Sequence, residues 1–128
     1  MNINDVTRKE VLKALEFCAL KFGTSRYNGG VPRIHFMSKN KMASDSICKG
    51  YYKVDKNVIV IFKKAHNTCV DLLDTVIHEY THYLQNLHRY AVLSRSYNYY
   101  DHPYEIEAWD TGLKYKWDCK DYITGLAS

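Results

Sequence analysis

Long apolar runs are missing from this chain. The longest uninterrupted one, VIVIF from Val58 to Phe62, is far shorter than the roughly 20 residues that a helix needs to cross a bilayer. The N-terminal stretch MNINDVTRKE also lacks the apolar core of a secretory signal. We therefore expect a cytoplasmic location, without export and without a membrane partner.

Cysteine pairs are missing as well. The cysteines lie far apart, and no two of them form a CxxC motif of the kind that binds zinc: Cys18, Cys48, Cys69 and Cys119. Thiols stay unpaired in the reducing compartment that we expect for this chain. The sequence thus predicts free thiols and no cysteine-based zinc site.

Linkers, repeats and strong charge bias are absent too. With 2 prolines, 6 glycines and no low-complexity stretch in 128 residues, the composition predicts one domain spanning residues 1–128. The net charge of +4 comes from lysines that are spread along the chain and interrupted by aspartates, which is typical of a solvated surface. Because there is no nucleic-acid recognition motif, we expect no nucleic-acid partner. The oligomeric state stays open.

The order of the helix and strand patterns indicates an α+β fold. An N-terminal amphipathic helix is expected, with Asp5 or Thr7 as its N-cap and Gly23 after its last turn. A small three-stranded twisted sheet is expected from the β-prone runs 33–37, 47–54 and 58–62, the last two joined as a hairpin. The apolar run 58–62 should be the central strand, whereas 47–54, which mixes lysine and tyrosine, should be an edge.

The strongest helical pattern covers residues 66–87. Thr68 is its expected N-cap, and the apolar residues form one stripe at helical spacing: Val70, Leu73, Ile77, Tyr80, Leu84 and Leu87. The motif HEYTH, residues 78–82, lies in the middle of this helix. The pattern therefore predicts that both histidines of the motif are carried by a helix.

The spacing of these histidines favours a metal site. Four residues advance about 400° around a helix, so His78 and His82 project from one face, close enough to bind a single ion. Glu79 follows His78 directly and can reach a water molecule on that ion, which is the position of the general base in the HExxH arrangement of metallopeptidases.

A catalytic zinc ion normally takes a third protein ligand and leaves one position for water. His88 would complete the spacing HExxHxxxxxH, but Gln85 stands where that arrangement has a glycine that turns the chain out of the helix. If the helix continues through Leu87, His88 lies about 9 Å of rise beyond His82. We therefore interpret His88 as a histidine at the helix end.

The pattern at residues 100–117 predicts another helix and offers two glutamates. Asp101 is its expected cap, Pro103 lies near its start, and apolar residues recur at helical spacing: Ile106, Trp109, Leu113 and Trp117. On a helical wheel Glu105 falls on the side of Ala108 and Gly112, whereas Glu107 shares its side with polar residues. A buried carboxylate needs a partner or a metal ion, so Glu105 is the preferred third ligand and Glu107 the alternative.

With these residues the chain resembles the gluzincins, zinc metallopeptidases that carry HExxH on one helix and a glutamate ligand on the next. It is most similar to their minimal forms, which phages, viruses and bacteria encode. The segments that carry the resemblance are GYYKVDKNVIVIF, DTVIHEYTHYLQ and HPYEIEA. The resemblance implies a zincin-like domain with one Zn²⁺ ion that cleaves a peptide or protein substrate, in the host cytoplasm if the gene is of phage or viral origin.

The resemblance also implies roles for individual residues. His78, His82 and Glu105 would bind Zn²⁺, and Glu79 would activate water and move its proton. The edge 47–54 would pair with an extended peptide substrate. An oxyanion donor is expected from the segment SRSYNYYDHPY, in which we choose two candidates, Tyr100 and His102. Trp109 stands where larger members have an aspartate that orients a histidine, which leaves that role open among Asp74, Asp101 and Asp110.

Two other interpretations are consistent with the same residues. A zincin-like protein can bind a metal ion and a partner without cleaving anything, as a regulator or adaptor. The small size of the chain favours this interpretation, and the presence of Glu79 disfavours it. A DNA-associated protease of the SprT-like type also carries HExxH, but it would need a third histidine at the metal, either His88 or His102.

Overall fold

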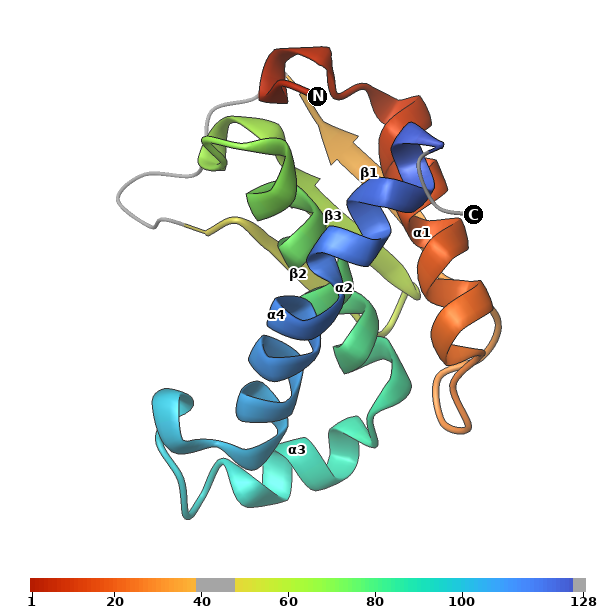
Figure 1. Ribbon diagram of the computed structural model, residues 1–128. Helices are drawn as coiled ribbons and strands as arrows, with labels where there is room; N and C mark the ends of the chain where they lie inside the picture. Colours follow the sequence, from red (N-terminus) through yellow and green to blue (C-terminus); the bar gives the residue numbers. More distant parts are fainter. Residues whose placement is uncertain (39–47, 126–128) are drawn as a thin grey trace.

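A three-stranded sheet and four α-helices make up the fold, seen in a computed structural model that describes residues 1–38 and 48–125 (Figure 1). The elements follow in the order η1 (Ile3–Asp5), α1 (Arg8–Phe22), β1 (Arg33–Met37), β2 (Gly50–Lys53), β3 (Val58–Phe62), η2 (Lys63–Ala65), α2 (Cys69–Leu84), α3 (Leu87–Leu93), η3 (Tyr99–Asp101) and α4 (Pro103–Thr124). The expected α+β class is confirmed. The expected strand 47–54 is shorter, and its first residue, Ile47, lies outside the described residues.

The sheet has the strand order β1-β3-β2, with β1 parallel and β2 antiparallel to β3. The apolar strand β3 is central and β2 is an edge, as expected. The carbonyl of Lys49 accepts a hydrogen bond of 3.0 Å from the N–H of Phe62. Since alternate residues of an antiparallel strand bond to the neighbouring strand, the N–H and C=O groups of Gly50 and Tyr52 point to the other side of β2, an edge that is open among residues 1–38 and 48–125.

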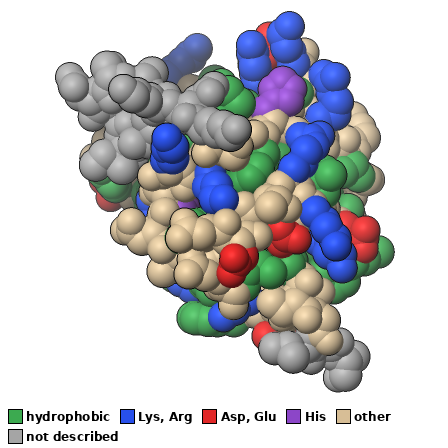
Figure 2. All heavy atoms as spheres, turned by 90° about the horizontal axis from the view of Figure 1, so that it is seen from above, with side chains coloured by type: hydrophobic (Ala, Val, Ile, Leu, Met, Phe, Trp, Pro, Cys, Tyr) green, Lys and Arg blue, Asp and Glu red, His purple; other side chains and the backbone are tan. Residues whose placement is uncertain are grey.

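The helices α1, α2 and α4 lie on one side of the sheet (Figure 1). Ile34, Ile59 and Ile61 point from the sheet into this shared core, and Cys18, Cys69 and Cys119 are buried there as free thiols. On the face seen in Figure 2, Lys and Arg side chains are spread among apolar and acidic ones. Within residues 1–38 and 48–125, no helix combines the length and the apolar character needed to cross a bilayer.

Helix α2 ends earlier than the apolar stripe predicts. It begins after Thr68, whose side chain accepts from the N–H of Asp71 at 3.0 Å, and its last residue is Leu84. The expected continuation to Leu87 is wrong, because Gln85 adopts an extended backbone (φ −85°, ψ 157°) and Asn86 caps a new helix, α3. The break brings α3, a helix that the sequence did not predict, to the end of α2.

Helix α4 crosses α2 at very short range. Its buried residues include Glu105, Ala108 and Gly112, as the helical wheel predicts. A Cβ atom on Gly112 would lie 1.9 Å from Oδ1 of Asp74, so the missing side chain is what allows this approach. Asp74 is one turn before His78, and the close crossing therefore brings the first turn of α4 to the two histidines.

Two expectations for α4 are wrong. His102, and not Asp101, is the N-cap, because its Nδ1 accepts from the N–H of Tyr104 at 3.1 Å. The helical wheel places Ile106 among the buried-type residues around Glu105, but Ile106 is 42% exposed, and the other apolar residues at helical spacing, Leu113 and Trp117, are 58% and 57% exposed. The face that packs on α2 consists mainly of small residues and Glu105, and this leaves the larger side chains outside.

Replacing Gly112 with alanine tests the close crossing. Alanine has a helix propensity about 1 kcal/mol better than glycine, but its Cβ would displace the Asp74 carboxylate, and overpacking of this kind costs about 1–3 kcal/mol. We expect Gly112→Ala to lower the free energy of unfolding in urea by about 1 kcal/mol. In an Asp74→Ala background the carboxylate clash is removed while the gain in helix propensity remains, so the same change should be neutral or stabilising by up to about 1 kcal/mol. An equal loss in both backgrounds would contradict the account.

Candidate metal centre

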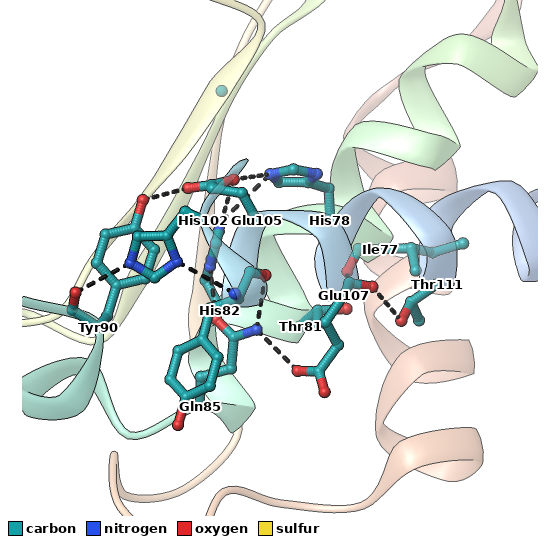
Figure 3. A network of polar contacts seen from close by, with 12 residues as sticks. Ile77, His78, Thr81, His82, Gln85, Tyr90, His102, Glu105, Glu107 and Thr111 are labelled. Carbon is teal, nitrogen blue, oxygen red and sulfur yellow. Dashed lines mark hydrogen bonds and ion pairs between the residues drawn. The ribbon is translucent and has the colours of Figure 1, made fainter. Parts of the chain in front are cut away.

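Three side chains from α2 and α4 converge on one point (Figure 3). Oε1 of Glu105 lies 3.1 Å from Nε2 of His78 and 3.1 Å from Nε2 of His82, and the two imidazole nitrogens are 3.2 Å apart. The side chains are 12%, 10% and 5% exposed for His78, His82 and Glu105. The structure thus brings together the three expected ligands, close enough to bind one metal ion.

Hydrogen bonds alone cannot satisfy this triangle of atoms. If both Nε2 atoms carry protons, both can donate to the Glu105 carboxylate, but two N–H groups then face each other at 3.2 Å. If one of them is unprotonated, its contact with Glu105 joins two acceptors. A cation between the three atoms removes both conflicts, because each atom then presents a lone pair to it. The geometry therefore fits a metal site better than an ordinary polar cluster.

Gln85 sets the tautomer of His82. The amide nitrogen of Gln85 donates to Oε1 of Glu107 at 2.8 Å and to the carbonyl of Tyr104 at 2.9 Å, and both partners can only accept. Its Oε1 must then face Nδ1 of His82, 2.7 Å away, so Nδ1 carries the proton. The lone pair of Nε2 is thereby directed to the cluster, which is how outer partners orient metal-binding histidines.

Tyr90 holds the other oxygen of the ligand carboxylate. Its hydroxyl donates to Oε2 of Glu105, which leaves Oε1 toward the histidines. Burial opposes ionisation of Glu105, but the adjacent His78 and His82 rings and the hydrogen bond from Tyr90 outweigh it and hold the pKa of this carboxyl well below its usual range. Glu105 therefore supplies a negative charge to the site.

Glu79 lies beside the cluster and is 7% exposed. Burial raises the pKa of its carboxyl and the charge of Glu105 adds to this, whereas His78, His82 and the backbone N–H of Tyr52 work in the opposite direction. Gly50, Tyr52 and Glu79 line the same cavity, so the edge strand β2 lies next to Glu79. A carboxyl with a raised pKa at this position is suited to taking up and releasing a proton.

Two cavities meet at the cluster. One, of about 380 Å³, extends toward Asp71, Asp74 and Trp109, and the other, of about 330 Å³, extends toward Leu87 and Tyr90. Both share the same central residues: Gly50, His78, Glu79 and Tyr99. A Cβ on Gly50 would lie 2.6 Å from the Val60 carbonyl on β3 and 3.1 Å from Cγ2 of Thr75 on α2, so this glycine lets the edge strand lie close to α2. The result is a cleft that follows the open edge of β2.

The two chosen oxyanion donors are not placed in this cleft. Tyr100 is 76% exposed and stacks on Trp109, with 6.1 Å between ring centroids. His102 uses both ring nitrogens elsewhere, since Nδ1 caps α4 and Nε2 donates to the carbonyl of Tyr90 at 3.0 Å. Tyr99 is the tyrosine of this segment that lines both cavities. Burial and the nearby charges of Glu105 and Glu79 raise its pKa to about 12, so its hydroxyl keeps its proton.

The alternative ligands lie outside the cluster. His88 is exposed in the first turn of α3, and Glu107 is exposed and reaches the site only through Gln85. Within residues 1–38 and 48–125, no hydrogen bond joins a ring nitrogen of either ligand histidine to any of the expected orienting aspartates: Asp74, Asp101 and Asp110. For His82, the orienting contact comes from Gln85 instead.

Sequence reasoning missed three residues of the site: Gln85, Tyr90 and Tyr99. Gln85 was considered only as the residue that replaces a glycine, although a polar side chain three residues after a ligand histidine can reach back to its ring. Tyr90 could not be found, because α3 is too short to give a periodic signal. Tyr99 was among several tyrosines in one loop, and spacing does not distinguish among them.

We also compared the chain with known proteins. Neither the protein-family models nor the curated proteins nor the solved structures give a match.

Replacing Gln85 tests how the site is oriented. In Gln85→Ala the Nδ1 proton of His82 loses its acceptor, and we expect the affinity for Zn²⁺ to fall by about 10–100-fold. Competition with a chromogenic chelator measures this affinity. His88→Ala serves as the control and should bind Zn²⁺ as the wild type does. Unchanged affinity in Gln85→Ala would show that the Gln85 contact does not support a metal ligand.

Proposed function

We propose that this protein is a zinc-dependent hydrolase of the gluzincin-like type, with a zincin-like fold, and that it cleaves peptide bonds. One observation carries the proposal: the His78, His82 and Glu105 donors converge beside a buried glutamate, Glu79, at the open edge of a strand. Metal ligands, a base and a surface for an extended chain are then adjacent in one cleft.

Zinc is the metal that the donors favour. Two imidazoles and one carboxylate form the ligand set of catalytic zinc sites, whereas structural sites use four protein ligands. With zinc–ligand bonds of about 2.0–2.1 Å, two ligands of a tetrahedral ion are about 3.3–3.4 Å apart. The observed separations of 3.1–3.2 Å are close to this value. A larger ion such as Ca²⁺ takes more ligands, mostly oxygen, at longer distances.

Different residues of the chain have different roles in the proposed reaction. Zinc bound at this site would supply Lewis acidity, polarising a scissile carbonyl and making a water molecule easier to deprotonate. The carboxylate of Glu79 takes the proton of that water and then donates it to the amine of the leaving peptide. The hydroxyl of Tyr99 donates to the oxygen on which negative charge develops. Tyr90 and Gln85 hold the ligands in place throughout.

The open edge of β2 accounts for the choice of a peptide substrate. Gly50 and Tyr52 direct backbone N–H and C=O groups that are not bonded to β3 along the cleft, and an extended peptide can pair with them as an added strand. Such pairing holds the backbone of the substrate at a fixed distance from Glu79 and the metal ligands. Main-chain pairing is insensitive to side chains, so the cavities on either side of the cluster would set the sequence preference.

Replacing Glu79 with glutamine separates catalysis from metal binding. The amide keeps the shape of the side chain but cannot accept a proton, so we expect peptide cleavage to fall by about 10²–10⁴-fold while the Zn²⁺ content stays unchanged. The assay is cleavage of a peptide library, followed by mass spectrometry. Glu16→Gln, at an exposed position on α1, is the matched control and should behave as the wild type. If wild type and Glu79→Gln are equally inactive, the interpretation as a metal-binding adaptor is favoured instead.

Removing the hydroxyl of Tyr99 tests its role as a donor. Tyr99→Phe should lower kcat by about 10–10³-fold with little change in Zn²⁺ affinity, because the lost hydrogen bond forms with the developing charge. Tyr100→Phe, at the neighbouring position, should keep full activity. Steady-state kinetics on a cleaved library peptide measures both. The role of Tyr99 is contradicted if the two variants lose activity equally.

A further inference from the structure

A stripe of apolar side chains runs along the outer side of α4. Ile106, Leu113 and Trp117 are 42%, 58% and 57% exposed, and Trp109 lies between them, partly buried. With 100° per residue, the three exposed side chains fall within about 40° of one another around the helix. Contiguous exposed apolar residues of this kind mark interaction sites more often than isolated ones do. These four residues are called the α4 stripe below.

Two opposite charges border the α4 stripe on the same flank. Asp110 and Lys114 are exposed and lie about 40° apart around the helix, on the side away from α2. Neither forms an ion pair with another residue in the described part of the chain, although the Lys114 ammonium lies 5.3 Å from the centre of the Tyr115 ring. One flank of the stripe thus presents a negative and a positive group that are free to pair.

We propose that the α4 stripe is the contact surface between two copies of this chain, packed with their α4 helices antiparallel about a twofold axis. In such a pair of helices, each residue lies opposite one residue of the second copy. The two sequence numbers of an opposing pair always have the same sum, which is twice the number at the level of the axis. An axis at the level of Gly112 places Leu113 within two residues of the level of Trp109 of the second copy, and Ile106 within one residue of the level of Trp117 of the second copy. Each apolar residue then meets another apolar residue of the same stripe.

The same axis pairs the charges. In two antiparallel helices related by a twofold axis, the same flank of each helix faces its copy. Asp110 of one chain then lies opposite Lys114 of the other, and symmetry repeats the pair. The numbers 110 and 114 average to 112, and the apolar pairs 109 and 113 and 106 and 117 average to 111 and 111.5, so the two levels agree to within one residue, about 1.5 Å of rise. This agreement favours a second copy over an unrelated partner as the occupant of the stripe.

The lysines on the other flank stay apart from their copies in this arrangement. Lys116 and Lys120 border the other flank of the α4 stripe, where Lys116 lies 3.8 Å from Asp74 and Lys120 lies over the Trp117 ring. Lys116 is four residues from the axis, so it is separated from Lys116 of the second copy by about 12 Å along the helices, and the Lys120 pair is farther apart. Asp110 and Lys114 each lie about 6 Å along the helices from their own copies but level with their oppositely charged partners, so the attractive contacts are the closer ones.

The contact would also border the cleft. Trp109 belongs to the α4 stripe and lines the cavity next to Asp74, and its ring centroid is 6.2 Å from that of His78. Tyr99 and Tyr100 pack on the Trp109 ring, so the second copy would meet Trp109 together with these two tyrosines. The proposal rests on the surface of α4 alone and does not depend on the proposed activity.

Sedimentation velocity over a concentration series tests the dimer with charge reversals. We expect the wild type to dimerise, and Lys114→Asp and Asp110→Lys each to weaken dimerisation at least tenfold, because each places like charges opposite each other twice. The double variant Asp110→Lys/Lys114→Asp restores both pairs and should return to within about threefold of the wild type. Leu113→Asp should abolish the dimer. Leu20→Asp, at a position 73% exposed on α1, is the control and should not affect it.

Each result decides the proposal. A wild type that stays monomeric up to about 0.5 mM overturns it, since a specific contact should be populated well below that concentration. A dimer that survives Leu113→Asp, or that the double charge reversal fails to restore, uses another surface and also overturns it. Circular dichroism of each variant shows that the fold is retained, and Leu20→Asp controls for the added charge.

Discussion

The distance between α2 and α4 is the constraint on which the site depends. Two histidines on one face of α2 offer only two ligands, and the third must come from another helix whose carboxylate reaches within 3.1 Å of both. A side chain larger than hydrogen at Gly112 would push the helices apart at Asp74, one turn from His78. The surface of α4 that packs on α2 is therefore built from small residues around Glu105. The larger apolar side chains of the same helix are left on the outside, where they form the α4 stripe.

Polar contacts then orient the atoms that this packing brings together. Gln85 ends α2 and turns its amide back to His82, and its own orientation is set by acceptors at the start of α4. Tyr90 comes from α3 and holds the outer oxygen of Glu105. The termination of α2 at Leu84 is thus part of the site, since it places Gln85 beside the histidine ring and turns the chain toward α3. These contacts leave three metal-binding atoms in a triangle and Glu79 next to the open edge of β2.

The parts of this arrangement that could be predicted follow from periodic patterns. The positions of His78 and His82 follow from helical spacing, and the choice of Glu105 over Glu107 follows from the inward face of a helical wheel. The central and edge strands follow from apolar and mixed composition. Gln85 and Tyr90 could not be assigned, because a helix break and a seven-residue helix give no periodic signal. Exposure of the α4 stripe was not expected because periodicity locates an apolar face but does not say whether another part of the same chain covers it. Tyr99 required the three-dimensional path of its loop.

The central claim is that His78, His82 and Glu105 together hold one metal ion. Metal analysis by mass spectrometry on protein purified without chelator tests it most directly, with wild type and Glu105→Ala measured side by side. The account predicts about one zinc ion per wild-type chain and a large loss in the variant. Wild-type protein that carries no metal, or a Glu105→Ala variant that keeps its full zinc content, would contradict it.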